Sequence, residues 1–111
     1  MTEKALLIIT DLVPRSEIQI LPLSLFDSIT KLPVNGYHLV NNLLLFPALA
    51  YEAGDRLIYS HQIVVKDSIV APNAHLFRLT QVPHHWIVSE ELWQRLSKLD
   101  GYDAIAIATV P

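Results

Sequence analysis

The sequence predicts a single α+β domain spanning residues 1–111, in which a mostly antiparallel sheet packs against one or two helices. Three observations predict this class. Several short segments alternate apolar and polar residues, which is the period of half-buried strands. Only the segment after Val88 carries a full set of helix start and end signals. The chain of 111 residues also has the length of one ordinary domain.

The first part of the chain is expected to form two strands and a short helix. The apolar run 5–10 predicts a strand, and the weakly alternating segment 18–21 predicts a second one. Segment 25–32 is compatible with a short helix, because Ser24 can cap its start and Pro33 follows its end.

The middle of the chain is expected to contain short strands and turns. Asn35-Gly36 is typical of a turn. The run 37–46 fits a strand or a buried helix by periodicity, and its flanking Gly36 and Pro47 favour a strand. Further expected elements are a turn at Gly54-Asp55, strands at 56–60, 63–65 and 74–80, and a loop or edge segment at 67–73.

The helix after Val88 is the best specified element. Ser89 can cap its start, because a serine hydroxyl can accept a hydrogen bond from a free backbone N–H. Glu91 and Arg95 are spaced to pair along one turn, and Gly101 can adopt the left-handed conformation that ends helices. An apolar stripe is expected to face the core and consists of Leu92, Leu96 and Leu99, with Trp93 beside it.

The last segment, 104–110, alternates isoleucine and threonine with alanine and valine. This alternation predicts a strand. Neither face of it carries a charge, so we expect other elements to cover both faces.

Composition excludes several classes of protein. The absence of cysteine excludes a disulfide framework, a thiolate metal site and a cysteine nucleophile, and it fits a cytoplasmic protein. The net charge is -3 and the basic residues are scattered singly, which argues against a nucleic-acid partner. No apolar stretch approaches the roughly 20 residues that span a bilayer, and none resembles a signal peptide.

Hydrophobic residues make up 51% of the chain and charged residues 17%. Typical domains carry about 25% charged residues. Two interpretations remain open. Part of the apolar surplus could form an exposed interface for a partner or a second copy, or it could fill the core under a neutral surface.

The pair His84-His85 is the most conspicuous candidate for chemistry. Neighbours on an extended chain point to opposite faces, so the two imidazoles cannot readily share one metal. We therefore expect exposed loop histidines ahead of a strand, with no metal site and no cofactor. Ser60-His61 is a bare dipeptide without a nucleophile motif, and the chain is not expected to be an enzyme.

The chain's two tryptophans, Trp86 and Trp93, are candidate anchors for a protein interface, because tryptophan is enriched in binding hot spots. Trp93 borders the apolar stripe of the expected helix, which favours a place in the core. Core and interface remain equally open for Trp86.

The segment 75–107 carries a pattern that resembles a family of immunity proteins from bacterial polymorphic toxin systems, formerly catalogued as a domain of unknown function. The matching features are Leu76-Phe77-Arg78-Leu79, then Val88-Ser89-Glu90 opening a helix, then Gly101 and a closing hydrophobic strand. The segments 37–41 and 52–55 fit more loosely. The resemblance implies a protein that binds a toxin domain and provides no catalytic residues.

We therefore expect an immunity protein that binds and neutralises its cognate toxin by steric and electrostatic blocking. A non-enzymatic interaction module, including a homodimer, and a small hydrolase or lyase using His61 or His85 are the alternatives. The expected partner contacts are polar or aromatic, lie near turns and look exposed: Glu52, Asp55, Arg56, Tyr59, His84, His85 and Trp86.

Overall fold

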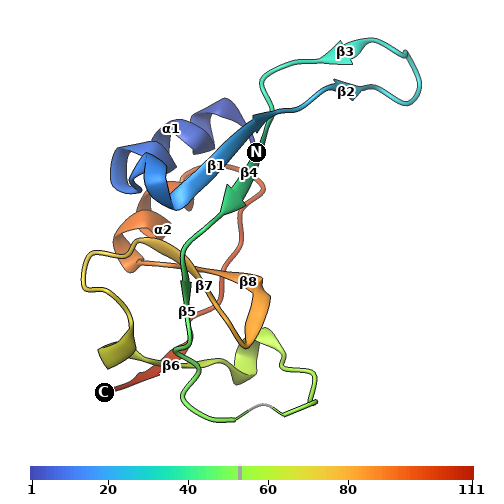
Figure 1. Ribbon diagram of the computed structural model, residues 1–111. Coiled ribbons are helices and arrows are strands. Elements are labelled where there is room, and N and C mark those ends of the chain that lie inside the picture. Colours follow the sequence, from blue (N-terminus) through green and yellow to red (C-terminus); the bar gives the residue numbers. More distant parts are fainter. Residues whose placement is uncertain (53) are drawn as a thin grey trace.

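The structure is a computed structural model that describes residues 1–52 and 54–111. It has two α-helices and several small, mostly antiparallel sheets, which confirms the predicted α+β class (Figure 1). The helices are α1 (Glu3–Leu12) and α2 (Glu90–Leu96), and short 3₁₀ turns lie at η1 (Arg15–Glu17), η2 (Ser60–Gln62) and η3 (Asp67–Ile69). Among the described residues, neither helix has the length and hydropathy that a membrane crossing requires.

Four small sheets contain the strands. The antiparallel pairs are β1 (Ile18–Pro22) with β4 (His38–Asn42) and β2 (Leu25–Phe26) with β3 (Pro33–Val34). The three-stranded sheet has the order β5 (Leu45–Phe46), β7 (Leu76–Leu79), β8 (Val82–Val88), with β5 parallel and β8 antiparallel to β7. The last pair is parallel and joins β6 (Val64–Lys66) to β9 (Ala108–Val110).

The apolar interior consists of two clusters. In the first, α1 and α2 pack together with β1 and β4 around Ile9 and Leu92. In the second, the three-stranded sheet packs with β6 around Val65 and Leu79. Strand β7 contributes to both, because Leu76 belongs to the first cluster and its neighbour Phe77 to the second.

The strand predicted over residues 5–10 is wrong, because this segment lies in α1. The hydroxyl of Thr2 caps the helix by accepting the N–H of Ala5 at 3.4 Å. Ala5, Ile9 and Val13 are buried at intervals of four residues, so the run presents one apolar face to α2 and β1. A run of five apolar residues fits a strand and a helix equally well, and the tertiary packing decides for the helix.

The short helix predicted over residues 25–32 is also wrong. The segment forms the hairpin of β2 and β3, with a turn between them. One carboxylate oxygen of Asp27 accepts the N–H groups of Ile29 and Thr30, both at 2.8 Å, and Lys31 takes a φ of 61°. These hydrogen bonds from the Asp27 side chain to its neighbouring backbone compete with helix formation. Aspartate side chains commonly stabilise turns in this way.

The other predictions for the middle of the chain are mostly confirmed. The run 37–46 forms β4 and β5, residues 54–55 form a turn, and parts of 63–65 and 74–80 lie in β6 and β7. Residues 56–59 form no regular strand, so the strand predicted at 56–60 is wrong.

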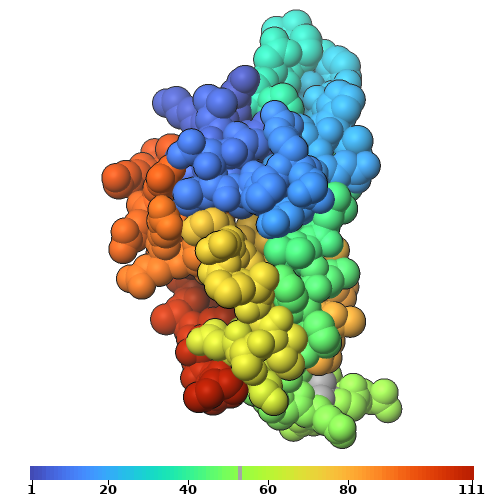
Figure 2. Space-filling model, turned by 60° about the vertical axis from the view of Figure 1, so that its left-hand side comes forward, coloured from blue at the N-terminus to red at the C-terminus, as the bar shows by residue number. Residues whose placement is uncertain are grey.

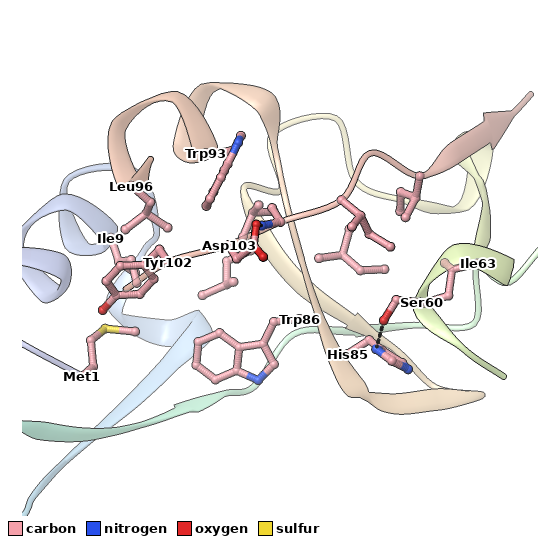
Figure 3. Close-up of a pocket in the computed structure, with 16 residues that line it drawn as sticks. Met1, Ile9, Ser60, Ile63, His85, Trp86, Trp93, Leu96, Tyr102 and Asp103 are labelled. Atoms are coloured by element: carbon pink, nitrogen blue, oxygen red, sulfur yellow. Dashed lines mark hydrogen bonds between the residues drawn. The ribbon is translucent and has the colours of Figure 1, made fainter. Parts of the chain in front are cut away.

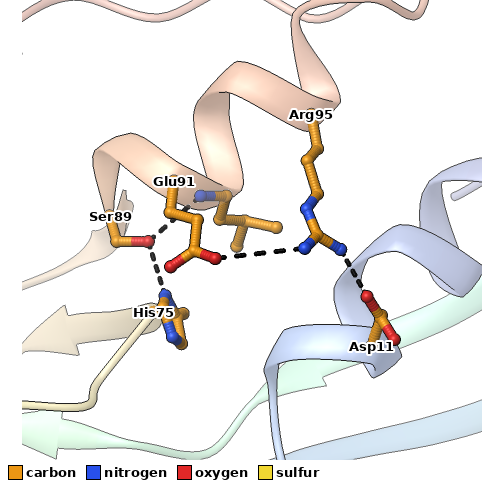
Figure 4. Close-up of polar contacts among 6 residues, drawn as sticks. Asp11, His75, Ser89, Glu91 and Arg95 are labelled. Carbon is orange, nitrogen blue, oxygen red and sulfur yellow. Dashed lines mark hydrogen bonds and ion pairs between the residues drawn. The ribbon is translucent and has the colours of Figure 1, made fainter.

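Helix α2 begins as predicted. Ser89 Oγ accepts the N–H of Leu92 at 3.1 Å and lies 2.7 Å from His75 Nδ1 (Figure 4). Leu92 and Leu96 are buried, as the stripe predicts. The helix ends at Leu96, however, and Gly101 takes its positive φ of 87° in the turn beyond.

An ion-pair network connects the two helices. Arg95 on α2 lies 3.9 Å from Glu91, as the spacing predicts, and also pairs with Asp11 on α1 (Figure 4). All three side chains are 40% exposed or more, so solvent screens the pairs and they orient the helices more than they stabilise them.

The strand predicted over 104–110 is shorter than expected and is not covered on both faces. Regular pairing is confined to β9, whose three residues are all exposed. Residues 102–107 have no regular structure, because β6 supplies a partner for only three residues.

Candidate functional site

The predicted partner contacts lie on strand β8 and on a loop of which the structure describes residues 52 and 54–59. Side-chain hydrogen bonds hold the described part of this loop. The Tyr51 hydroxyl donates to the Gln62 carbonyl at 2.7 Å, and the Gln62 side chain accepts the N–H of Tyr59 at 2.9 Å. Arg56 lies over the Tyr51 ring at 5.6 Å and donates to the Glu52 carbonyl at 3.0 Å. Glu52, Asp55, Arg56 and Tyr59 are all exposed.

His84, His85 and Trp86 lie within β8, so the prediction of loop histidines ahead of a strand is wrong. The predicted divergence of the two imidazoles is consistent with their burial, since His84 is exposed while His85 is half-buried. His85 Nδ1 lies 3.2 Å from Ser60 Oγ, and His85 Nε2 lies 3.4 Å from the Ile58 carbonyl. These contacts place the loop against β8.

The contacts of His85 favour one tautomer. A carbonyl oxygen can only accept, so Nε2 carries the proton and Nδ1 accepts the Ser60 hydroxyl. A serine hydrolase needs a base oriented by a third group and donors that stabilise an oxyanion. In this chain the third group is the Ile58 carbonyl, which is neutral and lies 3.4 Å from His85 Nε2. Within residues 1–52 and 54–111, no group of three His, Cys, Asp or Glu side chains is arranged to hold a metal ion.

A cavity of about 420 Å³ lies between β8, α2 and residues 102–107 (Figure 3). Trp86 enters it from β8 and Trp93 from α2, and the segment that follows α2 adds Tyr102 and Asp103. Figure 3 shows Asp103 between the two indoles, with Tyr102 beside Leu96. This volume falls within the range of about 300–1,000 Å³ that is typical of small-ligand sites.

The hairpin of β2 and β3 forms an arm that projects from the rest of the molecule (Figure 1, and the cyan segment at the top of Figure 2). We define the arm as residues 23–34. Its exposed apolar side chains include Phe26 at 66%, Ile29 at 87% and Leu32 at 63% exposure. The radius of gyration, 15.8 Å, exceeds the roughly 13 Å expected of a compact chain of this length, as a projecting arm requires.

The turn of the arm is held by a charged side chain. The backbone N–H groups of Thr30 and Ile29 donate to the Asp27 carboxylate and lower its pKa below the usual value. The charge of Asp27 is thus engaged within the turn, and most of the exposed side chains of the arm are apolar.

Sequence reasoning missed both the arm and the convergence of the cavity residues. Apolar residues at 25, 29 and 32 have helical spacing, but Pro22 and Pro33 around the Asp27-to-Thr30 segment are a signal for a hairpin turn. The convergence of Trp86, Trp93 and Asp103 depends on tertiary packing, and no spacing in the sequence reveals it. No protein-family model, curated protein or solved structure matches this chain.

Proposed function

We propose that this protein is an immunity protein, which binds the toxin domain encoded beside it and neutralises the toxin by covering its active site or substrate entry. The observation that carries a binding function is the arm, where Phe26, Ile29 and Leu32 expose most of their apolar surface to solvent. Exposed contiguous apolar patches on small proteins are typical of protein interaction sites.

The resemblance of segment 75–107 directs the proposal toward a toxin rather than another partner. A net charge of -3 favours a basic partner and faster encounter with it. Neutralisation by steric blocking needs no catalytic groups in the inhibitor. The Ser60–His85 pair is faced by a neutral carbonyl, that of Ile58, rather than by a carboxylate, which is consistent with such a role.

The test is toxin neutralisation with the toxin encoded by the neighbouring gene. Growth of cells that produce the toxin is measured with the wild-type protein and with a double variant of the arm, Phe26→Ser and Ile29→Ser. Burial of most of a phenylalanine side chain contributes about 2–3 kcal/mol to association. The affinity of the double variant for the toxin should therefore fall about 100-fold, and protection of the cells should weaken. A matched control is Leu7→Ser on α1, also an exposed apolar side chain at 64%.

Full protection by the arm variant would show that the toxin contact lies elsewhere. A second pair, Tyr59→Ala and Trp86→Ala, tests the contacts expected from the sequence on the loop and on β8. A neighbouring gene that encodes no toxin, or a toxin that stays active with the purified protein in excess, would refute the function itself.

A homodimer is the second candidate, because the apolar arm could equally bury itself against a second copy. Sedimentation velocity at micromolar concentration separates the two. A stable dimer that the arm variant dissociates would favour self-association, and a strict monomer would exclude it.

A further inference from the structure

We propose that the cavity between β8, α2 and residues 102–107 is a site for an organic cation, and that its occupant is an arginine side chain of the protein partner. This inference rests on the proposed binding function and names the chemistry of one contact. Three aromatic side chains and one carboxylate carry it: Trp86, Trp93, Tyr102 and Asp103.

The aromatic side chains provide the apolar part of the site. The ring-to-ring contacts among the described residues join Phe46 to Phe77 and Tyr59 to His61, so neither indole of the cavity is stacked on another ring. A cation is attracted to the face of an indole or phenol ring, and a guanidinium also stacks on it. Trp86 is 42% exposed, which leaves the cavity open to a group from outside.

The cavity lining includes one carboxylate, that of Asp103. Asp103 is exposed, and its Oδ1 accepts the N–H of Ala104 at 2.9 Å, which leaves Oδ2 for a ligand. No lysine or arginine is among the described residues that line the cavity. Met1 also lines the cavity, and its positively charged amino group is engaged by the His38 carbonyl, to which it donates at 2.7 Å.

Arginine suits this combination better than a small inorganic cation. A guanidinium is planar, is weakly hydrated and forms a bidentate pair with a carboxylate. Its methylene stem can lie along the apolar walls formed by Ile87 and Ile105. A metal ion would find one carboxylate, and an imidazole, that of His85, whose two ring nitrogens already contact Ser60 and the Ile58 carbonyl, which is a poor ligand set.

The test is a titration of the purified protein with N-ethylguanidinium, with the neutral N-ethylurea as matched control. Both tryptophans of the chain line this cavity, so intrinsic fluorescence responds to its occupancy. Trp93 also borders a neighbouring cavity, and a variant of Asp103, which lines only the first cavity, separates the two. We expect a saturable change with N-ethylguanidinium in the millimolar range and binding of N-ethylurea at least about tenfold weaker. Equal responses to the two compounds, or no saturable response to N-ethylguanidinium, would overturn the inference.

Two variants locate the charge. Asp103→Asn should weaken N-ethylguanidinium binding about tenfold, because the charged hydrogen bonds become neutral. Asp100→Asn should leave it unchanged, since Asp100 is exposed and does not line the cavity. Both positions are on the surface, and equal thermal melts will show that both variants fold. Equal affinities of these two variants would contradict the site.

The titration uses no partner protein, so its failure is distinct from failure of the proposed function. A protein that neutralises the toxin but does not bind N-ethylguanidinium refutes the cation site alone. A protein that binds N-ethylguanidinium but does not protect against the toxin refutes the immunity function alone.

Discussion

Replacement of Asn42 by leucine should stabilise the protein. Asn42 lies on β4 opposite Ile18 and is 2% exposed. Neither its Nδ2 nor its Oδ1 has a hydrogen-bond partner among the described residues. A buried amide without a partner costs about 1–3 kcal/mol, because it has given up its hydrogen bonds to water.

Leucine has the same branched skeleton of side-chain heavy atoms as asparagine, is somewhat bulkier, and carries no polar atoms. Asn42→Leu removes the desolvation cost of the amide. Imperfect packing of the new side chain offsets this gain by up to about 1.5 kcal/mol. The free energy of unfolding should therefore rise by about 1 kcal/mol, and Tm by about 4 °C. Urea unfolding monitored by fluorescence measures the change, with an unaltered m value as a check that the unfolded state is the same.

The adjacent residue provides the control. Asn41 is exposed and its Nδ2 donates to Gln19 Oε1 at 2.8 Å, so Asn41→Leu should change the free energy of unfolding by less than about 0.5 kcal/mol. If Asn42→Leu instead lowers the free energy of unfolding by about 1 kcal/mol or more, the reasoning is refuted. That result would show that the amide of Asn42 has hydrogen-bond partners in solution.

Three further predictions test the packing of α2 and the turn of the arm. Leu92→Ala should cost about 3 kcal/mol in urea unfolding, because Leu92 is fully buried; a loss below about 1 kcal/mol would contradict its place in the core. Ser89→Ala should lower the free energy of unfolding by about 1 kcal/mol, since it removes the helix cap, whereas the exposed Ser97→Ala should leave it nearly unchanged. The lowered pKa of Asp27 means that its contribution to the turn is complete above its ordinary value of 3.8 and is lost as the pH falls through the lowered pKa. The amide shift of Ile29 should follow this titration in the wild type but not in Asp27→Asn, and a persisting titration in the variant would assign it to another group.

The elements that the sequence predicted well are those whose signals are local. The Ser89 cap and the stripe of Leu92 and Leu96 lie within α2, so tertiary packing only had to agree with them. The strand predicted over 74–80 followed in the same way from the alternation of that segment, and it forms over Leu76–Leu79. Capping and alternation act over a few residues, which is why they can be read from a single sequence.

The failed predictions share a different cause. Residues 5–9 are an apolar run that fits either a helix or a strand, and the helix expected over 25–32 rested on Ser24 as a cap and on Pro33 as a stop. Packing against α2 made the first a helix, and the carboxylate of Asp27 made the second a hairpin. The sequence likewise placed Trp86 among the partner contacts but could not associate it with Trp93 or Asp103, because that association depends on how residues 102–107 cross α2 and β8.

The distribution of apolar side chains resolves the question that composition left open. Among the described residues, large hydrophobic side chains are exposed about as often as they are buried, and those on the arm contact neither core cluster. A well-filled core under a neutral surface therefore does not account for the apolar surplus. Removal of Phe26 or Ile29 from the arm should leave the folded monomer almost as stable as before. Under the proposed binding function, the free energy that those side chains can contribute is realised in association with the partner.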